Sequence, residues 1–255
     1  MSSSIANPWI SHREPSKRAT SRLFCFPYAG GGAPIFRSWQ KRVPPPTEVC
    51  AIQLPGRGAR IRETPFSRMR PLVSALTDAL LPLFDKPFAF FGHSMGAWVS
   101  FEVARVLKEK HEIEPFHLFV SGAWAPQVGS RETPIYDLPE HEFIDALRVL
   151  NGTPKELLES AELMALLVPV LRADFAVCET YKYATGPPLD CAVTAFGGLQ
   201  DRRLSRGDLK AWSEQTTGPF AMRMLPGDHF FLHENEPAIV ESIVAELGKS
   251  ANNSA

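Results

Sequence analysis

The stretch FFGHSMGAWVS, residues 90–100, places one serine between two glycines where an apolar run ends. Consecutive large apolar residues before Gly92 are typical of a buried strand, and the residues after Ser94 have the composition of a helix. The segment GHSMG (92–96) matches the pattern Gly-x-Ser-x-Gly, in which a sharp strand-to-helix turn exposes the serine hydroxyl at the carboxyl end of a sheet. We therefore predict that Ser94 is a nucleophile. A plain Gly-Ser turn without chemistry is the alternative.

Short apolar runs alternate with longer helical patterns on both sides of this stretch. Several of the runs are apolar at consecutive positions, as expected for parallel strands that are covered on both faces. The alternation predicts an α/β fold with a mostly parallel central sheet flanked by helices. Strands are expected at 23–28, 48–54, 88–92, 116–121, 191–196 and 220–225, and helices at 71–83, 95–110, 208–215 and 237–249.

The segment 127–190 interrupts this alternation, because it contains helical patterns at 139–150 and 162–180 and no good strand. We expect a helical insertion, either a lid over a site or a plain packing layer. Residues 1–21 are polar and basic and are expected to form a flexible tail. The predicted organisation is a single α/β domain over 22–250, with a helical lid at about 127–190.

The composition is that of an ordinary globular chain of 255 residues, with 27 basic and 28 acidic side chains and a net charge of -1. This balance of charges gives no strong electrostatic field that would attract nucleic acid or an anionic membrane surface, so neither is an expected partner. The first 22 residues lack the apolar segment of a signal peptide, and the longest apolar run, 163–171, is too short to span a bilayer. We expect a cytoplasmic protein, and nothing indicates an obligate assembly, so a monomer is expected.

The four cysteines are widely spaced and form no Cys-x-x-Cys pair. Three of them lie within apolar runs, so we interpret the cysteines as reduced, buried thiols. Zinc binding or a disulfide is the alternative. No metal and no organic cofactor is expected. The four are Cys25, Cys50, Cys178 and Cys191.

A serine nucleophile needs a base, and two of the seven histidines, His229 and His233, remain after local features are considered. His229 follows an expected strand and a Gly-Asp turn, which can carry an imidazole across the sheet edge. His233 lies near the last helix and is expected at the surface or at a helix cap. The others are His12 in the tail, His111 and His117 beside a helix end, His141 in a polar helix and His93, which is expected to support the turn at Ser94.

The base needs a carboxylate to orient it, and Asp201 follows an expected strand and a Gly-Gly turn. The order serine, acid, histidine along the chain is the one expected for a Gly-x-Ser-x-Gly elbow. Asp228 adjoins the histidine in sequence and cannot easily reach its Nδ1. Asp174 and Asp190 precede the strand and are weaker candidates, and a helix or loop cap is the alternative role for Asp201.

The oxyanion that forms during attack needs two N–H donors. One is expected to be the N–H of Met95, because it begins the helix beneath the serine. The other is expected in the loop FCFPYAGGGAP (24–34), where Pro27 has no N–H, so Tyr28 or Ala29 must donate. A phosphate-binding loop is disfavoured there, because neither Gly-x-Gly-x-x-Gly nor Gly-Lys-Ser/Thr occurs.

Five segments of the chain resemble those of a known family. FPYAGGG (26–32), LPGRGAR (54–60), FFGHSMGA (90–97), FGGLQD (196–201) and PGDHFFL (226–232) are similar, in the same order, to segments of the stand-alone type II thioesterases of polyketide and nonribosomal peptide synthesis. Five ordered motifs make this resemblance far more specific than the serine motif alone.

The resemblance covers about residues 22–248 and implies an α/β-hydrolase fold with a helical lid. It implies hydrolysis of acyl groups from the phosphopantetheine arm of acyl or peptidyl carrier proteins. That reaction clears misprimed or stalled chains from a polyketide or nonribosomal peptide synthase in antibiotic and other secondary metabolism. The family's nucleophile, acid, base and two oxyanion-hole N–H donors match Ser94, Asp201, His229, Ala29 and Met95.

Two further groups of residues have more than one interpretation. An acyl pocket could be lined by Tyr28, Met164, Leu167, Leu171 and Phe175, although the last four have helical spacing and are equally consistent with ordinary core. A carrier-docking surface could be formed by five arginines, for which a solvated loop is the simpler interpretation. These are Arg57, Arg60, Arg62, Arg68 and Arg70.

Three other functions are consistent with the same scaffold. A carboxylester hydrolase or an acyltransferase would use the same three side chains, because pocket shape and water access select the acceptor. A thioesterase that releases a finished product would prefer one long acyl chain. A non-catalytic binding protein is the alternative from a different class, and the intact serine, acid and histidine argue against it.

Overall fold

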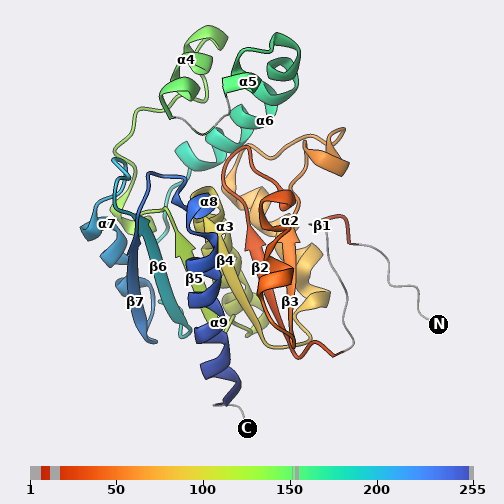
Figure 1. The fold of residues 1–255 in the computed structure, drawn as a ribbon, viewed down its shortest axis with the longest axis vertical. Helices are drawn as coiled ribbons and strands as arrows, with labels where there is room; N and C mark the ends of the chain where they lie inside the picture. Colours follow the sequence, from red (N-terminus) through yellow and green to blue (C-terminus); the bar gives the residue numbers. More distant parts are fainter. Residues whose placement is uncertain (1–6, 12–17, 151, 153–154, 253–255) are drawn as a thin grey trace, which may run out of the picture.

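The computed structural model describes residues 7–11, 18–150, 152 and 155–252, which form a seven-stranded sheet (Figure 1). The strand order is β1-β3-β2-β4-β5-β6-β7, and neighbouring strands are parallel except for the antiparallel pair β1–β3. The strands are β1 (Ile10–Ser11), β2 (Ser21–Phe26), β3 (Thr47–Ile52), β4 (Phe88–His93), β5 (His117–Ser121), β6 (Ala192–Gly198) and β7 (Phe220–Leu225). The predicted fold class is therefore confirmed.

Helices cover both faces of the sheet (Figure 1). Helices α2 and α3 lie on one face, and α1, α8 and α9 lie on the other. The helices are α1 (Trp39–Arg42), α2 (Met69–Leu80), α3 (Met95–His111), α4 (Glu140–Leu150), α5 (Lys155–Leu158), α6 (Ala161–Glu179), α7 (Arg206–Lys210), α8 (Phe231–Glu234) and α9 (Glu236–Asn252). Short 3-10 turns are η1 (Ala33–Phe36), η2 (Gly58–Arg60), η3 (Leu81–Leu83), η4 (Pro126–Val128) and η5 (Ala211–Gln215).

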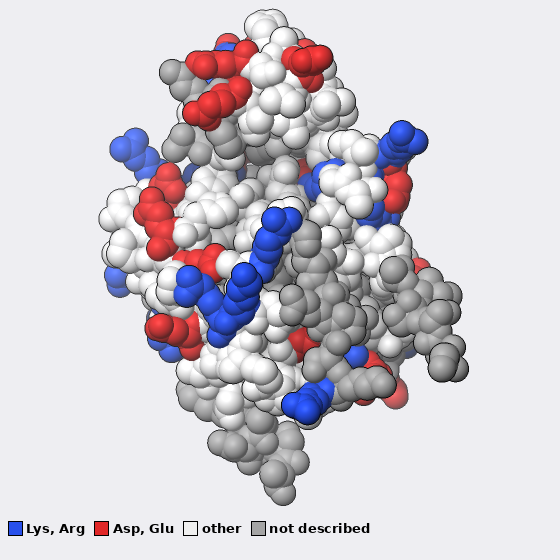
Figure 2. Space-filling model, turned by 45° about the vertical axis from the view of Figure 1, so that its right-hand side comes forward, with Lys and Arg blue, Asp and Glu red and all other residues white. Residues whose placement is uncertain are grey.

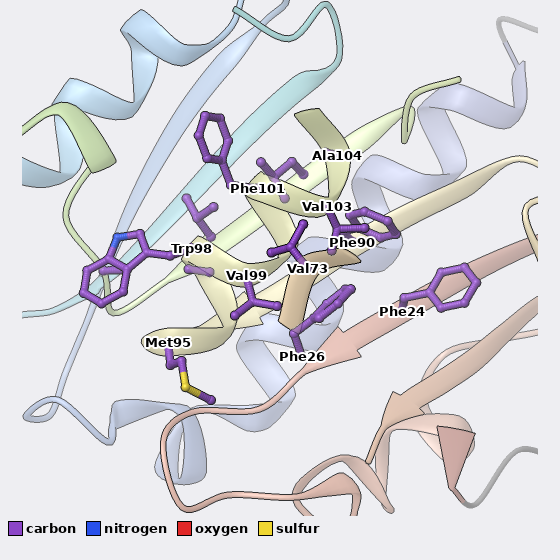
Figure 3. Close-up of a cluster of buried hydrophobic side chains, with 14 of the residues drawn as sticks. Phe24, Phe26, Val73, Phe90, Met95, Trp98, Val99, Phe101, Val103 and Ala104 are labelled. Atoms are coloured by element: carbon purple, nitrogen blue, oxygen red, sulfur yellow. The ribbon is translucent and has the colours of Figure 1, made fainter. Parts of the chain in front are cut away.

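The strands are apolar at consecutive positions because alternate side chains enter different cores. In β2, Phe24 and Phe26 pack on the side of α2 and α3, whereas Leu23 and Cys25 pack on the side of α9. Figure 3 shows Phe26 beside Val99 of α3 and Val73 of α2. Burial of each such aromatic contributes roughly 1.5–3 kcal/mol before the costs of ordering, so the elbow at the end of β4 rests on a rigid support.

The predicted helical insertion consists of α4, α5 and α6, which lie above the strands in Figure 1. The three helices share a small core of their own, which includes Phe143, Leu147 and Met164. Helix α6 continues through Pro169, which is exposed to solvent. This core is separate from the two cores that cover the sheet.

The N-terminal segment differs from the expected flexible tail. Ile10 pairs with Ile52 in the antiparallel bridge of β1, and the N–H of Gln53 donates to the carbonyl of Trp9 at 2.8 Å. Trp9 is buried, and the Arg60 guanidinium lies 4.1 Å from its ring centroid. This docking covers the otherwise unpaired edge of β3. Residues 1–6 and 12–17, with His12 among them, lie outside the described part of the chain.

Two smaller expectations were also wrong. The helix expected at 208–215 is α7 followed by η5, because a tighter turn begins at Ala211. His117 lies in β5 and not beside a helix end; it is buried, with Nε2 2.9 Å from Thr194 Oγ1. Among the described residues, no helix combines the length and the apolar character needed to cross a membrane.

Candidate active site

Ser94 stands at the sharp turn between β4 and α3, with φ 53° and ψ -118°. Its N–H donates to the carbonyl of Ser121 on the neighbouring strand at 2.7 Å, which holds this strained conformation. The flanking glycines are required by close packing. A Cβ on Gly92 would lie 2.1 Å from the carbonyl oxygen of Gly96, and one on Gly96 would lie 2.2 Å from that of Phe26. The sequence motif therefore forms the expected elbow.

The structure brings three of the predicted site residues into one hydrogen-bonded chain. His229 Nε2 lies 3.0 Å from Ser94 Oγ, and His229 Nδ1 lies 2.9 Å from Asp201 Oδ2. Asp201 follows β6 and His229 follows β7, so parallel strands carry both side chains to the edge where β4 ends. Asp201 is 8% exposed and His229 9% exposed, so little water competes for these contacts. The arrangement can move a proton from the serine to the imidazole.

Asp201 is held as a carboxylate. Burial alone would raise its pKa, but the hydrogen bond and the charge of His229 lower the pKa below the ordinary value. The backbone N–H of Arg203 donates to the other carboxylate oxygen at 3.0 Å. Asp228, in contrast, accepts from the N–H of Phe230 within its own turn, and Asp190 binds Lys108. The imidazole Nδ1 of His229 therefore has Asp201 as its carboxylate partner.

His93 supports the turn, as the sequence predicts. The ring is fully buried, with Nδ1 2.9 Å from Ser121 Oγ and Nε2 3.0 Å from the carbonyl oxygen of His229. A carbonyl only accepts, so Nε2 carries the proton and Nδ1 accepts from the serine hydroxyl. Burial, followed by the nearby charge of His229, lowers the pKa of His93 well below its ordinary value of 6.5. The imidazole therefore stays neutral and fixes the backbone of the histidine loop.

The neutral state of His93 makes stability depend on pH. Below pH 6.5 the unfolded chain binds a proton that the folded chain does not, so the free energy of unfolding falls as the pH falls. We expect this residue to contribute a slope of up to about 1.4 kcal/mol per pH unit below that point. Urea unfolding of wild type and His93→Gln between pH 7.5 and 5.5 measures it. The slope should shrink in His93→Gln and persist in the exposed control His141→Gln; an unchanged slope in His93→Gln would contradict the assignment.

The two predicted oxyanion donors are the N–H of Met95, which follows Ser94 in the chain, and the N–H of Ala29. Met95 is the first residue of α3, where N–H groups have no partner within the helix. Ala29 follows Tyr28 in a turn closed by the N–H of Gly31, which donates to the carbonyl of Tyr28 at 2.9 Å. That bond does not use the Ala29 N–H, and Ala29 lines the same cavity as Ser94. Both N–H groups therefore stay predicted donors to a negative oxygen beside the serine.

A buried ion pair, which the sequence did not predict, links this turn to helix α6. Asp174 of α6 accepts two hydrogen bonds from the Arg57 guanidinium, at 2.5 and 2.8 Å. Its Oδ2 also accepts from the N–H of Gly30 at 2.7 Å, and Arg57 donates to the carbonyl of Gly31 at 3.0 Å. Both side chains are buried. Helix α6 and Arg57 therefore hold the backbone that directly follows Ala29.

Removal of this carboxylate should weaken both the fold and the turn. In Asp174→Ala the buried Arg57 loses its partner, and we expect the free energy of unfolding to fall by about 3–5 kcal/mol. We also expect kcat to fall about tenfold, because the Ala29 N–H is no longer held in place. Urea unfolding and steady-state kinetics measure the two effects. Glu63→Gln is the matched control, because Glu63 pairs with Arg60 from an exposed position; equal effects of the two substitutions would refute the prediction.

A cavity opens beside Ser94, and only some of the expected pocket residues line it. Tyr28, Leu171 and Phe175 do line it, whereas Met164 and Leu167 do not. Met164 is buried in the core of the helical insertion, and Leu167 packs against that core. Helical spacing placed these residues on α6 correctly but could not tell which side faces the serine. His233 lies outside the serine site, with Nε2 3.0 Å from the Tyr28 hydroxyl.

The five arginines do not form one surface. Arg57 and Arg60 are buried in ion pairs, so they fit neither a docking surface nor a solvated loop. Arg62, Arg68 and Arg70 are exposed, as both interpretations expect. Figure 2 shows basic and acidic side chains mixed over one face, with acidic ones gathered on the lid at the top. A contiguous group of basic side chains lies near the centre of the same face (Figure 2).

The cavity is also lined by a thiol, that of Cys178, which was expected to be buried in the core. Burial raises the pKa of the Cys178 thiol well above the ordinary value. A protonated thiol is a weak nucleophile, so Ser94 is the better one here. All four cysteines are free. Within the described residues, no cluster of three or more histidine, cysteine or acidic side chains could hold a metal ion.

Comparisons with known proteins cover nearly the whole chain. A family model described as a thioesterase domain matches residues 21–247. Gramicidin S biosynthesis protein GrsT of Aneurinibacillus migulanus is 46% identical over 244 residues, which cover 96% of this chain and 95% of GrsT. The structure of the type II thioesterase BorB from the borrelidin biosynthetic cluster is similar with a TM-score of 0.85 at 36% identity, over 93% of this chain and 96% of BorB. The RedJ thioesterase of the prodiginine pathway in Streptomyces coelicolor has a TM-score of 0.83 at 39% identity, over 91% of this chain and 90% of RedJ.

Proposed function

The chain belongs to the thioesterase family, in the type II group of nonribosomal peptide and polyketide pathways, and we propose that Ser94, His229 and Asp201 carry its hydrolysis of acyl thioesters. The observation that supports these roles best is the hydrogen-bonded chain from Ser94 Oγ through His229 to Asp201. The N–H groups of Ala29 and Met95 are proposed to form the oxyanion hole.

The first half of the reaction acylates the serine. His229 Nε2 takes the proton of Ser94 as Oγ attacks the thioester carbon, and the negative oxygen is held by the two N–H groups. When the carbon–sulfur bond breaks, the imidazolium returns the proton to the sulfur and a thiol leaves. Asp201 stays a carboxylate throughout, since the pKa of this group is lowered, and it stabilises the imidazolium.

The second half releases the acid. A water molecule attacks the acyl-serine while His229 takes one of its protons, and that proton returns to Ser94 Oγ when the ester bond breaks. The buried, neutral His93 keeps the carbonyl of His229 in place during both proton transfers. Water must reach the acyl-serine for hydrolysis. The lid helices above the sheet are therefore proposed to control which molecule accepts the acyl group.

We propose that the acyl group arrives on the phosphopantetheine arm of an acyl or peptidyl carrier protein and that removal of misprimed or stalled chains is the purpose. The names of the relatives support this, because GrsT belongs to gramicidin S biosynthesis and BorB to the borrelidin cluster. We also propose that residues 22–250 act as a single domain with 127–190 as its lid. A cytoplasmic location and a monomeric state stay predictions from the sequence.

Two assays separate hydrolysis of thioesters from its chemical rivals. The first compares kcat/KM for a propionyl thioester of N-acetylcysteamine with that for the matched oxygen ester, and we expect the thioester to be favoured at least about tenfold. The second adds a large excess of a simple alcohol or amine and identifies the products. Free propionate is the expected product. Cleavage of the oxygen ester alone would indicate a carboxylester hydrolase, and transfer to the additive would indicate an acyltransferase.

A further inference from the structure

Tyr28 and His233 form a contact that no step of the proposed reaction uses. The Tyr28 hydroxyl lies 3.0 Å from Nε2 of His233, and the two residues are 205 positions apart in the chain. Each belongs to a segment that carries part of the site. Tyr28 directly precedes Ala29, and His233 lies in α8, four residues after His229. The contact therefore joins the turn of a predicted oxyanion donor to the segment of the base.

Aromatic side chains surround the ring of Tyr28. Its centroid lies 5.8 Å from that of His93, 5.3 Å from that of Phe230 and 5.8 Å from that of His233. In all three pairs the rings meet edge to face, an arrangement that aromatic pairs prefer. His93 supports the serine turn, and Phe230 directly follows the base in the chain. The ring therefore contacts both of the segments with which the oxyanion turn must stay aligned.

The direction of the Ala29 N–H depends on the residue before it. The backbone after Ala29 is held by Asp174 and Arg57. The Ala29 N–H itself lies in the planar peptide unit that joins Tyr28 to Ala29, so its direction follows the position of Tyr28. The contact with His233 supplies a side-chain hydrogen bond on that side of the peptide unit. An N–H that is aimed before the substrate arrives stabilises a developing negative oxygen without the cost of reorganisation.

We propose that Tyr28 and His233 are positioning residues, and that the hydrogen bond between them aims the Ala29 N–H at the negative oxygen of the reaction. This inference rests on the proposed function. Acylation and deacylation both pass through a negative oxygen, so loss of the hydrogen bond should slow both steps alike. KM then stays nearly constant while kcat falls, because KM of an acyl-enzyme reaction depends on the ratio of the two rates.

The test is a double-mutant cycle of Tyr28→Phe and His233→Leu, with kcat and KM measured for a propionyl thioester of N-acetylcysteamine. Tyr28→Phe keeps the ring and removes the hydroxyl, so it separates the hydrogen bond from the packing. We expect each single substitution to lower kcat about tenfold, with KM within about twofold of wild type. Because both remove the same hydrogen bond, the double variant should also lose about tenfold, whereas independent effects would multiply to about 100-fold.

Two further measurements distinguish positioning from a merely structural role. His233→Gln carries an amide that can form a hydrogen bond with the Tyr28 hydroxyl, and we expect its kcat within about threefold of wild type. Butaneboronic acid forms a tetrahedral adduct with Ser94 Oγ, which places a negative oxygen in the oxyanion hole. Its Ki should rise in Tyr28→Phe by about the factor by which kcat falls. Urea unfolding shows whether each variant is folded.

Tyr183→Phe and His111→Leu are the matched controls. The Tyr183 hydroxyl donates to Gln215 Oε1 at 3.0 Å, and His111 is exposed at the end of α3 that lies farthest from Ser94. Both controls should keep kcat near that of wild type. Unchanged kcat in both single variants, a rise in KM alone, an unchanged Ki or losses that multiply in the double variant would overturn the inference. Wild-type inactivity on every thioester would overturn the proposed function instead.

Discussion

Ser94→Ala is expected to lower kcat for acyl thioester hydrolysis by about 10⁵-fold or more. Without Oγ no acyl-enzyme forms, and His229 has no hydroxyl to deprotonate. The residual rate should come from the N–H groups of Ala29 and Met95 acting on direct attack by water. KM for a propionyl thioester and the free energy of unfolding should change little, because the hydroxyl is small and lines a cavity.

Ser100→Ala is the matched control for this substitution. Ser100 lies on the same helix and is fully buried, and its hydroxyl donates to the carbonyl of Ala97 at 3.0 Å. Loss of that hydroxyl tests whether a serine of α3 affects activity through the helix alone. We expect nearly full activity from the control. A Ser94→Ala enzyme that kept more than a small fraction of wild-type kcat would mean that another group is the nucleophile.

Asp201→Asn is expected to lower kcat by about 10⁴-fold while the fold stays intact. The amide has nearly the shape of the carboxylate but no charge, so it cannot stabilise the imidazolium. Its NH₂ group can also donate to Nδ1, which would place the imidazole proton on Nε2, facing the serine. Because the pKa of Asp201 is lowered, the wild-type carboxylate stays charged over the neutral range, and its protonation should not limit activity there.

The control for Asp201→Asn is Asp228→Asn, in the residue next to His229. Asp228 accepts a hydrogen bond from the N–H of Phe230 within its own turn, whereas the imidazole Nδ1 of His229 contacts Asp201. We expect its kcat to stay within about threefold of wild type, as for a surface substitution away from the reacting groups. If Asp228→Asn lost activity and Asp201→Asn did not, the assignment of the acid would be reversed.

Much of the site could be predicted from the sequence because the residues that form the serine turn are adjacent in the chain. A strand, a Gly-x-Ser-x-Gly turn and a helix are adjacent in the chain, so Ser94 and the Met95 N–H could be placed without any tertiary contact. Asp201 and His229 each follow a predicted strand. Because parallel strands end at one edge of the sheet, both side chains could be expected near Ser94. The structure brings these side chains within hydrogen-bonding distance.

The remainder depends on pairs that are far apart in the chain. Arg57 and Asp174 are 117 residues apart. Without knowledge of its partner, each charged residue is expected at the surface. Trp9 lies in a polar segment, so its docking on β3 could not be inferred from hydropathy. Helical spacing also identifies which residues share a face of a helix, but not which part of the molecule that face contacts. Met164 lies in the core of the helical insertion, whereas Leu171 lies in that core and also lines the cavity.

The most direct test is hydrolysis of a propionyl-loaded carrier protein by wild type, with Ser94→Ala in parallel. Mass spectrometry of the carrier protein and quantification of free propionate follow the reaction. We expect one propionate and one free phosphopantetheine thiol for each carrier turned over, and no measurable turnover by Ser94→Ala. A wild-type enzyme that left every loaded carrier intact while it cleaved simple oxygen esters would contradict the account.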